Sequence, residues 1–177
     1  MAASLFEKLI ASLAEISTQK ILLKGEHLIR EGETEKHLYY IESGAVRAFI
    51  LNEYEELTIR FGYEDSFINS LASYLQEKPS EIYIEAIRRT VVHAIPKAEV
   101  MKLVHESSQA QADYIKLLET TICQQMEREV DLLTVSPSER LQRVLKRSPH
   151  LFQQVPLKYI ASYLRMTPET LSRVRND

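Results

Sequence analysis

Hydrophobic and polar residues follow two different periods along the sequence. Near the start, apolar residues occupy positions 5, 6, 9, 10, 13 and 16. Steps of three and four match the turn of an α-helix, so an amphipathic helix is predicted over residues 4–20. From residue 21 to residue 95, apolar residues alternate with polar ones or form short runs, as at 38–41, 46–51, 57–61 and 83–87. This second texture is typical of β-strands.

Turn signals separate these short runs. They include Lys24-Gly25-Glu26, Glu31-Gly32-Glu33, Glu42-Ser43-Gly44 and Asn52-Glu53, and all four glycines of the protein fall within this section. Glycine adopts the positive φ of tight turns at no steric cost. Many short strands at this spacing predict an antiparallel barrel or jelly roll.

A long helical pattern follows the strands. Residues 97–133 contain neither Gly nor Pro, and one apolar seam includes Ile115, Leu118, Ile122, Met126 and Val130. At 1.5 Å per residue, a helix over residues 108–133 is about 39 Å long, which is more than one small barrel covers. The seam therefore predicts a parallel dimer of two such helices.

The last part of the sequence predicts several short helices. Ser136-Pro137-Ser138-Glu139 forms a capping box with proline at the first helical position. Helices are predicted over residues 138–146, over residues 156–164 and from Pro168 to the end. In the second helix, Leu157, Ile160, Ala161 and Leu164 form the expected buried face.

The final two of these helices have the pattern of a helix-turn-helix. Thr167 and Pro168 supply an N-cap and a first turn, and Leu171 and Val174 face inward. The outer positions are Glu169, Thr170, Ser172, Arg173 and Arg175. In such a motif the second helix enters the major groove of DNA. The alternative is a helical hairpin with a solvated outer face.

The outer side chains suit the reading of base pairs. Arg173 can donate two parallel hydrogen bonds to guanine, Glu169 can accept one from cytosine, and Thr170 can meet either kind of base. Lys158, Arg165 and Arg175 are better placed for phosphates, which fix register without reading sequence.

Composition and charge fit a globular protein with two kinds of module. The chain has 177 residues, of which 45% are hydrophobic and 27% charged. Residues 1–133 carry 14 Lys and Arg against 22 Asp and Glu, whereas residues 134–177 carry 8 against 3. Either the basic end binds nucleic acid or the asymmetry arises by chance. Without a signal-peptide pattern or a membrane-length apolar run, we expect a cytoplasmic protein.

Few residues suit metal or redox chemistry. Cys123, the only cysteine, excludes an intramolecular disulfide and a single-chain iron–sulfur site, and we expect it to be a small buried residue rather than a redox sensor. The five histidines lack the His-x-His pair of a cupin metalloenzyme, so neither a metal site nor an enzyme is expected.

The whole chain resembles the Crp/Fnr family of bacterial transcription regulators. The segments KGE (24–26), EG (31–32) and LYYIESG (38–44) resemble the signature of its cyclic-nucleotide-binding barrel. The segment KYIASYLRMTPETLSRVR (158–175) resembles its helix-turn-helix, in a version associated with regulators of the Bacteroides group. The resemblance implies an α+β fold with an antiparallel double-stranded β-helix (jelly-roll) barrel, a long dimerisation helix and a winged helix-turn-helix.

Carried onto this sequence, the resemblance makes Glu169 and Arg173 the main base-reading residues. A third reading position, often arginine in the family, is Pro168 here, which implies a different operator. The turn between the helices usually has glycine, where this chain has Arg165 at a position that implies a positive φ. The family's domain continues beyond its recognition helix, so we expect the C-terminal unit to be incomplete at Asp177.

The cassette that holds the cyclic phosphate in cyclic-AMP-binding relatives is altered. The matching stretch comprises Phe67, Asn69, Ser70, Leu71, Ser80, Glu81 and Ile82. Its usual Gly-Glu pair becomes Asn69-Ser70, and its phosphate-binding arginine becomes Ser80, which precedes Glu81. Since a cyclic phosphate needs a cation there, no physiological binding of cyclic AMP is expected. The barrel either binds another small effector or serves as a ligand-free scaffold, and Arg88 and Arg89 lie either near a pocket or at a strand end.

Together these features predict three units. Residues 1–107 form a sensor barrel, residues 108–135 a dimerisation helix and residues 136–177 a DNA-binding helix-turn-helix. The predicted partners are double-stranded DNA with an inverted-repeat operator and a second copy of the chain, and the resemblance also implies RNA polymerase. The alternative is a ligand-binding or protein-interaction barrel whose helix-turn-helix is vestigial.

Overall fold

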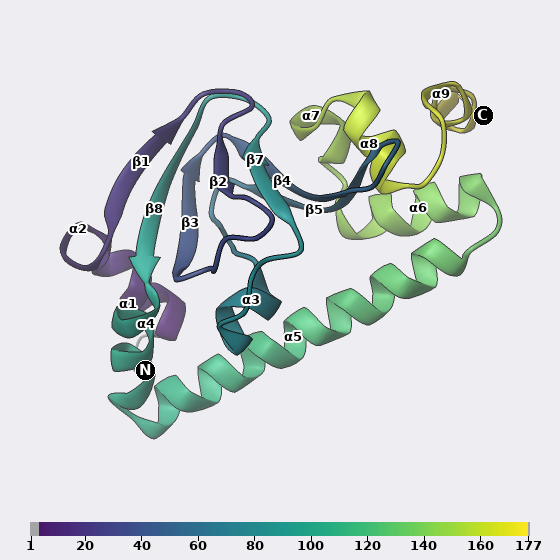
Figure 1. Ribbon diagram of the computed structural model, residues 1–177. Coiled ribbons are helices and arrows are strands. Elements are labelled where there is room, and N and C mark those ends of the chain that lie inside the picture. Colours follow the sequence, from purple (N-terminus) through teal and green to yellow (C-terminus); the bar gives the residue numbers. More distant parts are fainter. Residues whose placement is uncertain (1–3, 177) are drawn as a thin grey trace.

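The computed structural model describes residues 4–176 and combines facing β-sheets with a long helix and a helical C-terminal part (Figure 1). The long helix, α5 (Ser108–Leu133), crosses beneath the sheets and leads to the C-terminal helices. Residues 1–3 and 177, the ends of the first and last predicted units, lie outside the described residues.

Eight strands form two antiparallel sheets of four in the described part of the chain. The first sheet has the order β1 (Thr18–Leu22), β8 (Thr90–Pro96), β3 (His37–Ser43) and β6 (Ser66–Ile68). The second has the order β2 (His27–Ile29), β7 (Tyr83–Ala86), β4 (Ala45–Leu51) and β5 (Glu56–Tyr63). The chain passes between sheets at Gly44, where φ is +97° and an added Cβ would lie 2.5 Å from the Thr90 Oγ1 atom. Glycine is therefore required at this crossing.

The antiparallel sheets of the predicted barrel or jelly roll are confirmed, but the two sheets are not closed into a barrel. Within residues 4–176 no ladder connects a strand of one sheet to a strand of the other. The edge strands β2 and β6 have only three residues each, which is too few to continue pairing around the corner. The sheets are held together by their facing side chains, which include Tyr39, Ile41, Val46, Ile84 and Val92. Burial of apolar surface thus replaces the missing ladders.

Two further apolar clusters attach the helices to the sheets. One joins the helices near the N-terminus to the outer face of the first sheet through residues such as Leu9, Tyr40 and Val100. The other joins Ala45 of β4 and Ile87, which directly follows β7, to C-terminal residues such as Tyr159 and Ile160. The outer face of the first sheet is therefore covered by helices, whereas the second sheet meets the C-terminal helices mainly along β5.

The predicted N-terminal helix is shorter than expected and is interrupted. It consists of α1 (Leu5–Ala11) and α2 (Leu13–Ile16), which meet at Ser12, and residues 18–20 belong to β1. Pairing with β8 accounts for this difference, because it satisfies the backbone of β1 in a ladder instead of a helix. Two more helices complete this part of the chain, α3 (Leu71–Gln76) and α4 (Lys97–His105).

The C-terminal helices are α6 (Pro137–Arg147), α7 (Leu151–Gln154), α8 (Leu157–Tyr163) and α9 (Pro168–Asn176). The Ser136 hydroxyl accepts a hydrogen bond from the Glu139 N–H at the start of α6. The short helix α7 had no counterpart among the predicted elements. Cys123, which we expected to be buried, is exposed on α5. Within residues 4–176, no helix is both long and apolar enough to span a membrane.

A buried carboxylate joins α5 to α6. Asp131 is fully buried near the end of α5, and its Oδ1 atom accepts a hydrogen bond of 2.9 Å from the Arg143 Nε atom. The Arg147 guanidinium also donates to both oxygens of this carboxylate, which raises the pKa of Arg147. The antiparallel arrangement of α5 and α6 therefore depends on one anion shared by two cations.

The Asp131→Asn variant tests this joint. We expect it to lower the free energy of unfolding by about 2–4 kcal/mol, because it removes a buried charge that two arginines surround. The matched control is Glu127→Gln, which removes a half-exposed partner of the same Arg147 and should cost less than about 1 kcal/mol. Urea unfolding followed by circular dichroism measures both changes. Equal losses for the two variants would contradict the role of Asp131.

Candidate functional site

Helices α8 and α9 pack against each other across a four-residue turn, 164–167. Ile160 before the turn, Leu164 at its first position and Leu171 after it are almost fully buried. Leu157, expected in this core, is instead 45% exposed, and Tyr159 is buried in its place. The reason is that the ring of Tyr159 packs under the Arg47 guanidinium, 4.1 Å from its centroid, whereas Leu157 begins α8 on the solvent side.

The start of α9 is capped and exposed. The Thr167 hydroxyl accepts a hydrogen bond of 3.2 Å from the Thr170 N–H, and Pro168 occupies the first position of the helix. The side chains of Glu169, Ser172 and Arg173 are exposed. Hydrogen bonds from its own N–H and from the Thr167 hydroxyl lower the pKa of Glu169, which keeps the carboxylate ionised. These residues lie together on one accessible helix.

The predicted phosphate-binding residues Arg175, Arg165 and Lys158 each have a different neighbour within the chain. The Arg175 guanidinium sits over the Phe152 ring at 4.7 Å, at the far end of α9. Arg165 has a φ of +54°, as its place in the turn implies, and its Nη1 atom lies 3.8 Å from the Glu55 Oε1 atom. Lys158 is exposed on α8, with its ammonium 4.6 Å from the centroid of Tyr159. Lys158 and Arg165 therefore line, together with Glu55, Thr167 and Pro168, a hollow between the β4–β5 hairpin and the start of α9.

Helix α5 exposes the seam predicted for a dimer. Ile115, Ile122 and Met126 are each more than half exposed, Val130 is nearly so, and Leu118 is partly buried. Apolar side chains at this spacing along one helix face cost free energy in water unless another surface covers them.

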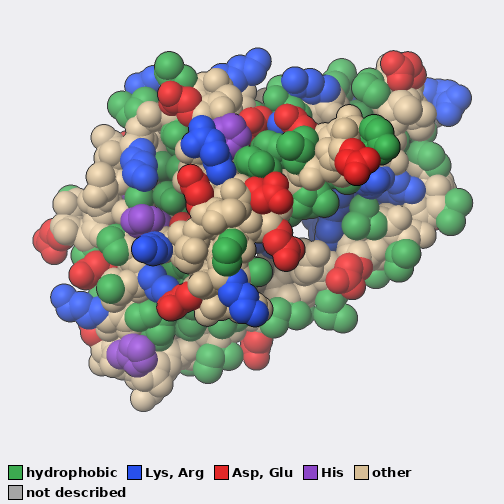
Figure 2. Space-filling model, in the orientation of Figure 1, with side chains coloured by type: hydrophobic (Ala, Val, Ile, Leu, Met, Phe, Trp, Pro, Cys, Tyr) green, Lys and Arg blue, Asp and Glu red, His purple; other side chains and the backbone are tan. Residues whose placement is uncertain are grey.

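A large cavity lies between the sheets and α5. Its volume is about 770 Å³, and its walls come from β4, β5, α3, the segment 78–82 and α5. Figure 2 shows the surface hollowed above α5. Apolar residues line much of it, among them Ile50, Leu57, Leu71, Ile82, Ile122 and Leu132. A cavity of this size and character suits a small organic molecule.

The structure brings most of the predicted effector residues to this cavity. Asn69, Ser70, Leu71, Glu81 and Ile82 line it. Two do not: Phe67 packs on the ring of Tyr40, and Ser80 is buried beneath the wall. Arg88 does not line the cavity either, since its guanidinium donates to the Gly44 carbonyl and to Gln154, and the adjacent Arg89 is exposed.

Two serines of the altered cassette bond to each other. The Ser70 and Ser80 Oγ atoms lie 2.9 Å apart, and the Ser80 hydroxyl also bonds to the backbone of Ile82. Glu35 lies buried beside Ser70, and burial raises the pKa of its carboxyl group. The place of the family's arginine is thus filled by hydroxyl groups that bond to each other.

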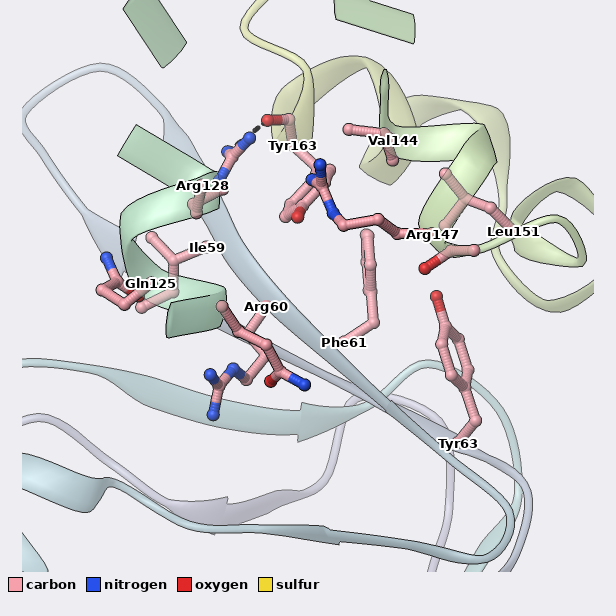
Figure 3. A pocket seen from close by; sticks show the side chains of 12 residues that line it. Ile59, Arg60, Phe61, Tyr63, Gln125, Arg128, Val144, Arg147, Leu151 and Tyr163 are labelled. Carbon is pink, nitrogen blue, oxygen red and sulfur yellow. Dashed lines mark hydrogen bonds between the residues drawn. The ribbon is translucent and has the colours of Figure 1, made fainter. Parts of the chain in front are cut away.

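Two arginines that the sequence pattern did not single out line the cavity. Arg60 comes from β5 and Arg128 from α5. Both also line a neighbouring pocket, drawn in Figure 3, whose other walls include Phe61, Arg147 and Tyr163. Strict alternation along residues 57–61 would place Arg60 on the outer face, but a β-bulge at Ile59 shifts the register, and Arg60 pairs with the core residue Ala48. No feature of the sequence marks the bulge. The only sign that Arg60 has a special place was its position within an otherwise apolar strand.

Arg128 links the cavity to the C-terminal helices. It is 6% exposed, its Nη2 atom donates to the Tyr163 carbonyl, and its guanidinium lies 3.8 Å from the centroid of the Tyr163 ring (Figure 3). Tyr163 is the last residue of α8. One side chain therefore contacts both the cavity and the helix that precedes the turn to α9.

Comparisons with known proteins agree with this architecture. Residues 19–107 match the cyclic nucleotide-binding domain family. No curated protein matches the sequence significantly. The version of the helix-turn-helix associated with the Bacteroides group stays a prediction.

Solved structures of regulators share the fold. FixK2 from Bradyrhizobium japonicum is 20% identical, with a TM-score of 0.77 over 91% of this chain and 83% of its own. A CooA mutant from Carboxydothermus hydrogenoformans is 19% identical, with a TM-score of 0.76 over 100% and 84%. The catabolite activator protein of Thermus thermophilus is 21% identical, with a TM-score of 0.59 over 96% and 81%. Because the family match covers half of the chain, this protein belongs to the cyclic nucleotide-binding domain family, and it has the fold of Crp/Fnr-type regulators.

Proposed function

We propose that the chain is a sequence-specific DNA-binding transcription regulator of the Crp/Fnr type. The observation that carries the proposal is the exposed start of α9, which presents Glu169, Thr170 and Arg173 from a helix held by α8 across a four-residue turn. A helix so exposed can enter the major groove with its N-terminal turns first. The protein acts by binding rather than by catalysis, in the cytoplasm, and RNA polymerase is the further partner that the resemblance implies.

Glu169 and Arg173 are the proposed base readers. The ionised Glu169 accepts a hydrogen bond from cytosine, and the Arg173 fork donates two to guanine. Arg175, Lys158 and Arg165 are proposed to bind phosphates. For Arg165 this requires that it leave Glu55, so DNA and the β4–β5 hairpin compete for the same guanidinium.

The proposed regulator is a parallel homodimer of three-part chains. Residues 1–107 form the sensor, residues 108–135 the dimerisation helix and residues 136–177 the DNA-binding unit. The exposed seam of α5 supports the dimer, because a second copy would cover the apolar side chains that one chain leaves in water. Two α9 helices would then meet successive major grooves, so the operator is an inverted repeat with half-sites about 10 base pairs apart.

The Arg173→Ala variant tests base reading. On an operator selected from random duplexes, we expect it to cost roughly 1–3 kcal/mol and to relax specificity at one base pair in each half-site. Fluorescence anisotropy with each single-base variant of the operator measures this. An equal loss of affinity for all sequences, with a reduced salt dependence, would instead make Arg173 a phosphate contact.

The Met126→Glu variant tests the dimer. A carboxylate in the apolar seam would be buried without a partner, so we expect the variant to sediment as a monomer at concentrations where the wild type is a dimer. The control is Thr120→Glu, which adds the same charge to an exposed position outside the seam. A dimeric Met126→Glu protein would place the interface elsewhere.

Cyclic AMP tests the altered cassette. We expect no heat of binding when cyclic AMP is titrated at micromolar protein concentrations, because Ser70 and Ser80 bond to each other and offer no cation to a phosphate. Micromolar affinity in that calorimetric titration would overturn this part of the proposal.

A further inference from the structure

A serine of α8 completes the edge of the second sheet. The Ser162 hydroxyl accepts a hydrogen bond of 3.0 Å from the Thr58 N–H and donates one of 2.9 Å to the Glu56 carbonyl. Both backbone groups belong to β5, which is the edge strand of its sheet. One side chain thus satisfies a donor and an acceptor that a neighbouring strand would otherwise pair.

Contacts on both sides of Ser162 join the same two parts of the chain. The ring centroids of Phe61 in β5 and Tyr163 in α8 lie 5.2 Å apart. Beyond the other end of the contact, the Glu55 Oε1 atom lies 3.8 Å from the Arg165 Nη1 atom. Figure 1 shows the β4–β5 hairpin reaching out to α8. The C-terminal unit is therefore docked on β5 as well as connected through α5.

This interface is not packed like a permanent core. It contains a hollow of about 220 Å³, whose walls include Arg60 and Tyr63 of β5 and Arg147 and Tyr163 of the C-terminal helices (Figure 3). Permanent cores have few voids larger than a water molecule, whereas contacts between units that move relative to each other are more polar. The contact between β5 and the C-terminal unit is therefore of the kind that opens.

The hairpin that holds α8 is acidic. Residues 51–59 contain three glutamates, Glu53, Glu55 and Glu56, but no lysine or arginine. Glu56 is paired with the buried Arg47, whereas Glu53 has no ion pair within residues 4–176. The outer part of the hairpin is therefore a local concentration of negative charge.

This negative charge lies beside the proposed DNA-binding surface. Glu55 lines a hollow of about 420 Å³ together with Lys158, Arg165 and the first residues of α9, Thr167 and Pro168. A DNA phosphate that approaches the start of α9 would meet a carboxylate at short range, where salt screens the repulsion only in part. The hairpin and the DNA backbone therefore compete for the same basic side chains.

We propose that the docked arrangement is autoinhibitory. The hairpin withholds Lys158 and Arg165 from DNA, and operator binding requires α8 to leave the edge of β5. The apparent affinity for DNA then falls in proportion to the fraction of chains in which α8 is undocked. This inference rests on the proposed function, because it concerns when the DNA-binding unit reads DNA, and it requires no ligand.

The Ser162→Ala variant tests the docking without changing the charge. In the docked state it leaves the Thr58 N–H and the Glu56 carbonyl without their partner, which disfavours docking. We expect its affinity for the selected operator, measured by fluorescence anisotropy, to rise about three- to tenfold. The control Ser12→Ala removes a half-buried serine between α1 and α2 and should leave the affinity unchanged. Since unfolding cannot raise affinity, a gain identifies the docking. Unchanged or weaker binding by Ser162→Ala would overturn the proposal.

The Glu55→Gln variant tests the part of the acidic hairpin. We expect it to raise operator affinity about two- to fivefold at low salt and less at high salt, because salt screens an exposed ion pair. The matched control is Glu53→Gln, which removes the same charge from the same hairpin but leaves the contact with Arg165 intact, and its gain should be smaller. Equal gains would mean that the hairpin repels DNA without holding Arg165 back, which contradicts the proposal.

Exchange of the Thr58 amide hydrogen reports docking directly, because Ser162 is its acceptor. We expect slow exchange in the wild-type chain without DNA and faster exchange both in Ser162→Ala and in the wild type bound to its operator. Specific operator binding with Thr58 still protected would overturn the autoinhibition and leave the regulatory function standing. If neither the wild type nor any variant prefers a DNA sequence, the regulatory function fails, and the autoinhibition fails with it.

Discussion

One turn of α5 carries two buried charges of opposite sign, and the position of the C-terminal helices depends on them. Arg128 donates to the carbonyl of Tyr163 in α8, and three residues later Asp131 accepts from Arg143 and Arg147 in α6. Each charge would be costly to bury alone, so its partners on the helical unit are needed to keep it inside. These two contacts, together with the hydrogen bonds of Ser162 in α8 to β5, position the C-terminal helices relative to the sheets.

The same turn of α5 borders the cavity. The cavity and the C-terminal helices are therefore in contact with the same residues of α5. Arg128 is shared between the cavity wall and α8, and Arg60 brings a second cation to the wall from β5. Buried apolar side chains hold the two sheets together, and such closely packed cores resist deformation. A change in the cavity would therefore displace α5 more readily than the sheets.

Sequence patterns predicted features that rest on local chemistry. The long helix, the Ser136 cap and the Thr167 cap follow from residues close together in the chain, whereas the positive φ of Arg165 was implied by the family resemblance. What could not be predicted rests on partners distant in sequence. Pairing with β8 made residues 18–20 a strand, a cation–π contact with Arg47 buried Tyr159 in place of Leu157, and a bulge turned Arg60 toward the cavity. The open edges between the sheets likewise depend on strand lengths that periodicity does not fix.

Hydroxyl-radical footprinting on an operator selected from random duplexes tests most directly whether two α9 helices read DNA together. Two protected segments related by two-fold symmetry, about one helical turn or 10 base pairs apart, are the predicted result. Protection of a single segment, or uniform weak protection along the duplex, would contradict a dimer that reads an inverted repeat.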